Sequence, residues 1–203
     1  MKKIIKYVGI SMFLVFLFCV GAMIADKMTL HNDIIRLHVV ANSDGENDQR
    51  IKLCVRDAII AFLQQEVVEL DNVKQVKGYL QQRLMELEEV ANNTLSSIGS
   101  KDRAKVYLTA EKFGARDYDT FSLPSGLYES LRIEIGQGKG KNWWCVIFPS
   151  LCLPTTQDGF SYVAASAGFN RGLINTLSES EGYEVRFFIL DCLGKIENFF
   201  SFS

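Results

Sequence analysis

The chain has 203 residues, enough for one domain of ordinary size and few for two. Hydrophobic residues make up 48% and charged residues 23%, which is typical of a globular protein and excludes a disordered one. The formal net charge of -2 argues against strong nucleic-acid binding, and His31 and His38 are too few for a His-rich metal site. We therefore expect no nucleic acid, no metal and no cofactor.

The N-terminal segment differs in kind from the rest of the chain. Lys2, Lys3 and Lys6 precede an uncharged apolar run over Tyr7–Ala25. A basic start before an apolar run is the pattern of an export signal, and this run is also close to the ~20 residues that span a bilayer. Two alternatives stay open, which are cleavage after Ala25 and retention as a membrane anchor. Both place the following residues outside, because the lysines stay inside.

Beyond this segment the chain reads as a single α+β domain, with a small antiparallel sheet packed on two or three helices. Apolar runs and alternation predict strands, and apolar residues at helical spacing predict helices. The expected strands cover residues 34–40, 106–110, 131–135 and 143–148, and the expected helices lie around 51–62 and 73–98.

The loops and domain limits follow from the same patterns. Residues 136–142 are expected to form a hairpin loop between two consecutive strands. Residues 155–182 lack a sustained apolar period and read as a long loop, before a short amphipathic helix near Ile189–Phe200. We divide the chain into a signal or anchor, an exported α+β core, and a loop and helix that complete the domain, over residues 1–25, 26–154 and 155–203.

Motifs for catalysis are weak. The glycine-rich segment Gly136–Asn142 invites a phosphate-loop interpretation, but a Walker loop has four residues between its glycines, ends in Lys and Ser/Thr, and opens a helix. Here three residues separate Gly136 from Gly140, and a Trp-rich strand follows. A basic hairpin tip, with Lys139 and Lys141 able to meet an acidic partner, is the better interpretation.

Four cysteines lie outside the apolar run. Cys145 and Cys152 flank a segment in which Pro149 can occupy the second position of a turn. Such a turn would bring the two residues within the ~5.5–6 Å Cα separation of a disulfide. An exported domain permits a Cys145–Cys152 bridge. The alternative is that both are buried thiols in a Trp-rich core.

Two blocks of sequence carry a resemblance. The first reads IRLHVVANSD over 35–44, continues with Asp48-Gln49, and then has Lys52, Val55, Arg56, Asp57 and Ala58. The second reads GKGKNWWCVIFPSLC over 138–152, and a Leu123-Pro124-Ser125-Gly126-x-Tyr128 turn stands between the blocks. Together, over roughly residues 30–153, they resemble the stage II sporulation protein R family.

This resemblance implies a signal and not an enzyme. Proteins of the family are exported from the forespore into the space between the two compartments of a sporulating cell. There they activate a membrane-embedded aspartic protease, the sigma-E processing peptidase, which cleaves pro-sigma-E in the mother cell. The catalytic aspartates belong to that protease, which agrees with the weak catalytic motifs here. The apolar run Tyr7–Ala25 would hold an uncleaved chain in the membrane.

Two patches are predicted to contact the partner, because activation requires a surface that binds the active arrangement of the protease better than its idle one. One is the basic tip with Lys139, Lys141 and Asn142, beside Trp143 or Trp144. The other is the turn with Asn42, Ser43 and Asp44, supported by Arg36 and His38. Read alone, the second set also fits turn and helix-capping residues.

Two other function classes compete with signalling. An exported hydrolase or amidase acting on cell wall would use His38 and Asp44 in acid–base roles, and would consume a substrate unaided. An exported adaptor would bind without switching anything.

Overall fold

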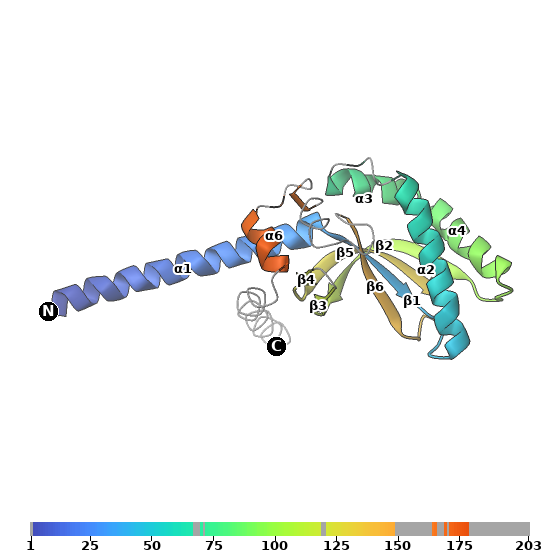
Figure 1. The fold of residues 1–203 in the computed structure, drawn as a ribbon, viewed down its shortest axis with the longest axis horizontal. Helices are drawn as coiled ribbons and strands as arrows, with labels where there is room; N and C mark the ends of the chain where they lie inside the picture. The colour runs from blue at the N-terminus through green and yellow to red at the C-terminus, as the bar shows by residue number, and fades with distance from the viewer. Residues whose placement is uncertain are drawn as a thin grey trace.

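The computed structural model describes residues 2–66, 70, 72–118, 121–148, 164–165, 169 and 171–178. Its elements in chain order are α1 (Lys2–Asp33), β1 (Ile35–Val40), α2 (Glu46–Glu66), α3 (Val73–Gln82), α4 (Leu84–Ser97), β2 (Ala104–Phe113), β3 (Arg116–Asp117), β4 (Ser122–Leu123), β5 (Gly126–Ile135), β6 (Asn142–Phe148) and α6 (Arg171–Ser178). Figure 1 shows α1 as a rod that leaves one end of a sheet covered by helices.

The main sheet has the strand order β2-β5-β1-β6. The six residues of β1 are all buried, and β1 pairs with β5 on one side and β6 on the other. Ile35, Leu37 and Val39 give β1 one wholly apolar face, while Arg36 and His38 on its other face are buried with polar partners, so the strand is covered on both faces. The short strands β3 and β4 form a separate two-stranded sheet.

The α+β class is confirmed, with two differences in strand pairing. The sheet is mixed, because β1 and β5 run parallel while the other neighbours run antiparallel. The expected hairpin over 136–142 is wrong, since β1 lies between β5 and β6 and the two do not pair. Consecutive strands usually pair, but β1, all of whose residues are buried, takes the central position and separates them.

Helices cover one face of the sheet and a second core fills part of the other. Alternate β1 residues Ile35, Leu37 and Val39 join the apolar residues of α2, α3 and α4 in one cluster. On the opposite face, Ile34 belongs to a cluster with Phe113, Tyr128, Val146 and residues of α6. Arg36 and His38 of β1, in register with Ser130 and Arg132 of β5, therefore lie on the second face, whereas Glu129 of β5 binds Lys77 of α3 on the helix face.

The helices differ from expectation at two points. The helix predicted over 73–98 is broken at Arg83, where φ is -107° and ψ 10°. Buried Leu80 and Leu87 stand two turns apart on one face, so the apolar period continues across the break and hides it. The loop predicted over 155–182 contains a helix, α6, at Arg171–Ser178. The amphipathic helix predicted near Ile189–Phe200 lies outside the described residues.

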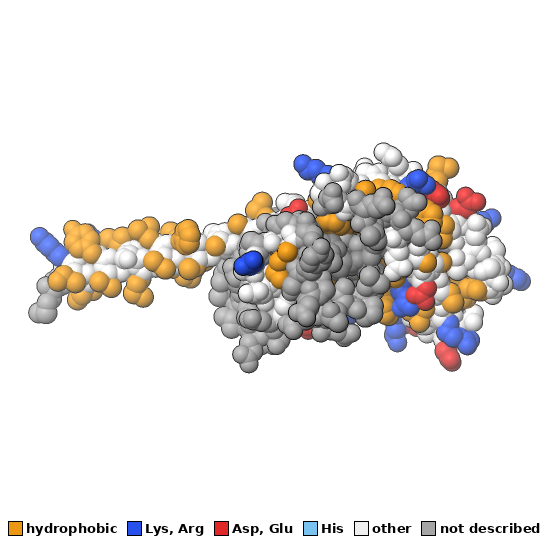
Figure 2. Space-filling view, turned by 45° about the horizontal axis from the view of Figure 1, so that its top comes forward, with side chains coloured by type: hydrophobic (Ala, Val, Ile, Leu, Met, Phe, Trp, Pro, Cys, Tyr) orange, Lys and Arg blue, Asp and Glu red, His pale blue; other side chains and the backbone are white. Residues whose placement is uncertain are grey.

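The N-terminal helix packs on nothing over most of its length. Its stretch Lys3–Ala22 is long and apolar enough to cross a membrane, and none of it is buried. Hydrophobic side chains cover the part of α1 that projects from the domain in Figure 2. A signal sequence and an anchor both have these properties, so the helix is consistent with export.

Candidate functional site

The turn after β1 is held by the first turn of α2. The Asn42 amide and the Ser43 hydroxyl both donate to one oxygen of the Asp48 carboxylate, at 2.9 and 2.6 Å. Gln49 donates from its side chain to the Ser43 carbonyl at 2.8 Å. These hydrogen bonds from Ser43 and Asn42 lower the pKa of Asp48 below its ordinary value. Since Asp48 also lies near the positive end of the α2 dipole, the turn and the helix stabilise each other.

The segment between β5 and β6 lies across this turn. The backbone N–H of Gln137 donates to the Asn42 side-chain oxygen at 2.9 Å, and that of Lys141 donates to Asp44 Oδ1 at 2.7 Å. The N–H of Gly140 donates to the Ala41 carbonyl at 2.8 Å. The two predicted patches, far apart in sequence, therefore form one unit, which we call the paired-loop surface: residues 42–44 and 137–142.

Glycines make this close approach possible. A Cβ at Gly140 would lie 2.2 Å from the Ser43 carbonyl oxygen, and one at Gly136 would lie 2.4 Å from Asn42 Oδ1. Gly136 and Gly138 also have positive φ, at 59° and 60°. The glycine-rich pattern is thus explained by packing between two loops and turning of the chain.

Cationic and aromatic side chains border the paired-loop surface. Lys139 and Lys141 are exposed, and their ammonium groups have no hydrogen bond or ion pair with the described residues. Trp143, at 38% exposed, stacks against the Arg56 guanidinium, which lies 4.2 Å from the ring centroid. Lys52 is buried and donates to the Lys141 carbonyl at 3.0 Å, which ties α2 to this loop. Burial, followed by the nearby Arg56 charge, lowers the pKa of Lys52.

Beneath this surface, His38 and Trp144 form part of the second sheet face. Their rings stack with centroids 3.7 Å apart. His38 Nδ1 lies 2.7 Å from Glu111 Oε2, and Arg132 binds the other oxygen of Glu111 at 2.7 Å. His38 is buried, so this network braces β1, β2 and β5 and does not face a partner directly.

Arg36 is placed deeper still. Its side chain is fully buried, its Nη2 donates to the Tyr118 hydroxyl at 2.6 Å, and its guanidinium lies 4.0 Å from the Phe113 ring centroid. Burial lowers the pKa of Arg36 below its ordinary value. Arg36 therefore lies in the second core at the start of β1, at the end of the strand away from the turn, and cannot touch a partner while the domain is folded. The expectation that it supports the Asn42–Asp44 turn is wrong.

The acid–base pair of the hydrolase hypothesis is not assembled by these contacts. The hydrogen bonds of His38 go to Glu111 and Arg132, while Asp44 accepts from the backbone of Lys141. Within the described residues there is also no group of three or more His, Cys, Asp or Glu side chains arranged to hold a metal ion.

The cysteines divide into two kinds. Cys19 and Cys54 are free and exposed, whereas Cys145 is disulfide-bonded. The other half of that bond lies outside the described residues, so pairing with Cys152 stays a prediction.

Two neighbours of the paired-loop surface were not among the predicted contact residues. Lys52 and Arg56 stand one turn apart on α2 and reach the loop and Trp143. Both belong to the first block of resemblance, and this membership is the feature of the sequence that could have identified them. Helical periodicity alone assigns them to an ordinary solvated face.

The fold and this surface define an α+β domain that joins two sequence blocks in one pair of loops and follows an apolar N-terminal helix. The family model for stage II sporulation protein R matches residues 31–158, and the chain belongs to this family. It is 30% identical over 132 residues to the stage II sporulation protein R of Bacillus subtilis, a match covering 65% of this chain. The match spans 59% of that relative's length. No solved structure matches the chain significantly.

Proposed function

We propose that this protein is an exported signal of sporulation that activates a membrane-embedded aspartic protease, and so causes pro-sigma-E processing in the mother cell. The observation that carries the proposal is the union of the two sequence blocks of the family resemblance in one surface. The blocks are separated by most of the domain, yet their loops are joined by four hydrogen bonds from the 137–141 backbone. Membership of a sporulation family supports the cellular setting.

The paired-loop surface has the properties of a protein-binding site. The ammonium groups of Lys139 and Lys141 make no ion pair within the described part of the chain, and Trp143 offers a partly exposed aromatic ring beside Arg56. Aromatic and cationic anchors of this kind dominate the energy of many interfaces. The backbone hydrogen bonds and Lys52 hold the loops in one arrangement, so little conformational entropy is lost on binding.

Activation then follows from differential affinity. A ligand shifts the equilibrium between two states of its receptor only by the difference in its binding free energy for the two states. A preference of about 5.5 kcal/mol would take the protease from 1% to 99% active. The unpaired lysines would contact acidic groups that are in reach only in the active arrangement.

The proposal is tested by reconstitution in a non-sporulating host that carries the protease and pro-sigma-E. Expression of the full chain is expected to cause cleavage of the pro-sequence. An immunoblot against sigma-E detects this cleavage. If the exported, folded chain leaves pro-sigma-E intact in the presence of a protease known to be competent, the proposal is wrong.

The surface is tested in the same assay by the double variant Lys139→Glu, Lys141→Glu. Reversal of two unpaired charges is expected to abolish cleavage and leave export and folding unchanged. Lys74→Glu with Lys112→Glu is the matched control, because these lysines are also exposed but lie on α3 and β2. Full activity of the first variant would remove the paired-loop surface from the mechanism.

A further inference from the structure

The junction between α1 and the domain has no linker. α1 continues unbroken to Asp33, and β1 begins at Ile35, leaving only Ile34 between them. Ile34 is itself buried in the core of the second sheet face. A flexible tether needs exposed, polar residues without packing, and this junction has the opposite character.

The last turn of α1 is seated against the start of β5. The His31 ring meets the Tyr128 ring edge-on, with centroids 4.8 Å apart. At Gly126 a Cβ would lie only 1.9 Å from His31 Nε2, so this position must be glycine for the imidazole to fit. Tyr128 is fully buried, and its hydroxyl donates to the Pro124 carbonyl at 2.7 Å. We call His31, Gly126 and Tyr128 the socket.

The socket explains a motif that the paired-loop surface does not use. Gly126 and Tyr128 belong to the turn that stands between the two blocks of resemblance. The family match also begins at residue 31, so it includes the helix residue that the socket holds.

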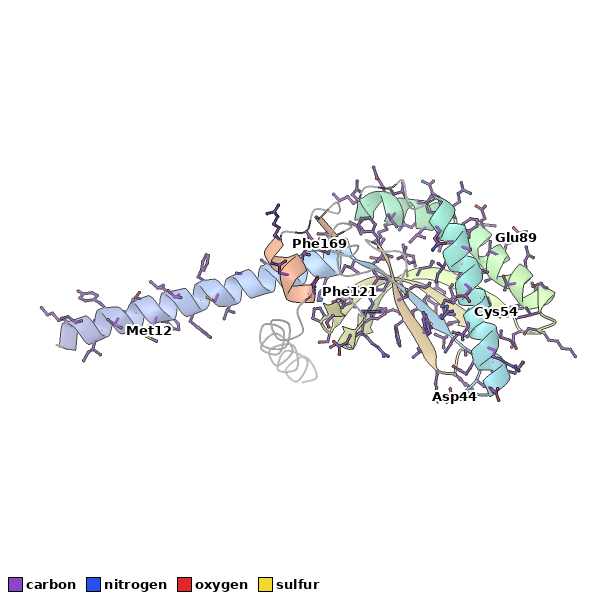
Figure 3. All side chains as sticks on the ribbon, in the orientation of Figure 1. Met12, Asp44, Cys54, Glu89, Phe121 and Phe169 are labelled. Atoms are coloured by element: carbon purple, nitrogen blue, oxygen red, sulfur yellow. The ribbon has the colours of Figure 1, made fainter. Side chains whose placement is uncertain are left out.

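The socket and the paired-loop surface lie at opposite ends of β1. α1 joins the strand at its first residue, and the turn with Asp44 follows its last residue. Six residues of strand span about 20 Å. Figure 3 shows Asp44 at the lower edge of the domain, beside the start of α2, with Met12 on the projecting part of α1 well away from it.

We propose that α1 is kept after export as a rigid stalk whose direction is fixed by the socket, so that the paired-loop surface points away from the membrane that holds Lys3–Ala22. The proposal rests on the proposed function, since it assigns the signal a partner in a facing membrane. From Ala22 to Asp33 the helix rises about 16 Å, which sets the distance between that membrane and the domain. A fixed direction also removes part of the orientational entropy cost of binding across the gap.

The native cysteines allow a direct test on the full chain. Cys19 on α1 and Cys54 on α2 are free and exposed, and they report on the stalk and the domain. The chain has five cysteines and Cys145 is disulfide-bonded, so the one of Cys152 and Cys192 that does not bond Cys145 is replaced by serine before labelling. Spin labels on both, in the chain placed in bilayer nanodiscs, are expected to give one narrow distance distribution by electron–electron double resonance. The variant Cys19→Ser must lose this signal. A broad distribution in the unaltered chain overturns the rigid stalk.

Retention is tested by the mass of the exported protein. The intact chain is expected, with α1 attached. A product that begins at Asp26, after cleavage at Ala25, overturns the proposal.

Two variants separate the stalk from the binding surface. Insertion of a Gly-Ser linker between Ala25 and Asp26 leaves the socket intact and is expected to broaden the distance distribution about twofold or more. Gly126→Ala should do the same by expelling His31, and the linker variant keeps the test valid if Gly126→Ala does not fold. Lys139→Glu with Lys141→Glu should keep the narrow distribution while losing cleavage. A narrow distance distribution in the linker variant would contradict the rigid stalk. Loss of cleavage in the Lys139→Glu, Lys141→Glu variant tests only the proposed function.

Discussion

At the scale of single residues, the structure assigns different roles to residues that the sequence groups together. Arg36 and His38 belong to the same block as Asn42, Ser43 and Asp44, yet the first two are buried and the others border solvent. The distinction follows from the strand, because Arg36 and His38 point into the second face of the sheet, whose core includes Phe113 and Tyr128.

Gly140 should be intolerant of any side chain. In Gly140→Ala the new Cβ would lie 2.2 Å from a backbone oxygen of Ser43, which cannot move aside as a flexible side chain can. We expect a loss of about 1–3 kcal/mol in the free energy of unfolding, measured by urea denaturation.

Gly78 provides the matched control for that substitution. It lies within α3 with nothing within 4 Å of a new Cβ. Gly78→Ala is therefore expected to raise stability by about 0.5–1 kcal/mol, because alanine restricts the unfolded chain and favours the helix. Equal effects of the two substitutions would show that the loops do not approach as described.

The Asp48 carboxyl should titrate below its ordinary pKa of 3.8, because Ser43 and Asn42 donate to its charged form. A carboxyl group whose pKa is lower in the folded than in the unfolded state stabilises the fold at pH values above its unfolded pKa. This stabilisation is lost as the pH falls through its folded pKa. Carboxyl NMR should therefore give a midpoint under 3.8, and Ser43→Ala with Asn42→Ala should raise it. A midpoint of 3.8 or more in the unaltered chain would contradict these hydrogen bonds.

At the scale of elements, the position of β1 determines the site. A strand between β5 and β6 places its final turn directly under the segment that joins them. The hydrogen bonds from Gln137, Gly140 and Lys141 to the turn are a consequence of this order. Had β5 and β6 formed a hairpin, as local pairing predicts, the two sequence blocks would have formed separate patches.

Hydrogen exchange provides the test of this strand order. Amides of β1 are paired on both sides and buried, so they are expected to exchange only through global unfolding. The amides of β2, which lies at the edge of the sheet, should exchange faster. If β1 exchanges as fast as β2, the central placement is wrong.

The sequence predicts an element when the pattern that marks it lies within the element itself. The strand at 34–40 and the amphipathic stripes of α2 and α4 are visible in periodicity, since burial of one face selects apolar residues there. The break at Arg83 is not visible, because the stripe through Leu80 and Leu87 stays in phase. The separation of β5 from β6 is equally hidden, since pairing between distant strands leaves no local pattern.

At the scale of the whole molecule, the residues of the paired-loop surface can be named from the sequence, but their joining in one surface cannot. The sequence blocks contain Lys139, Lys141 and Asp44, yet only the fold shows that Asp44 binds the backbone of Lys141. It also brings Lys52 and Arg56 to the same place from α2. The surface and the socket lie at opposite ends of β1, which is the arrangement that the proposed signalling across a gap requires.

The most direct test of the central claim is site-specific photo-cross-linking to the protease. A photoreactive amino acid is placed at Lys139 in the paired-loop surface, and at Lys112 on β2 as the control, in full chains that are both exported. We predict a cross-link to the protease from position 139 and none from position 112. Cross-linking from 112 with none from 139 would contradict the claim that the paired-loop surface binds the partner.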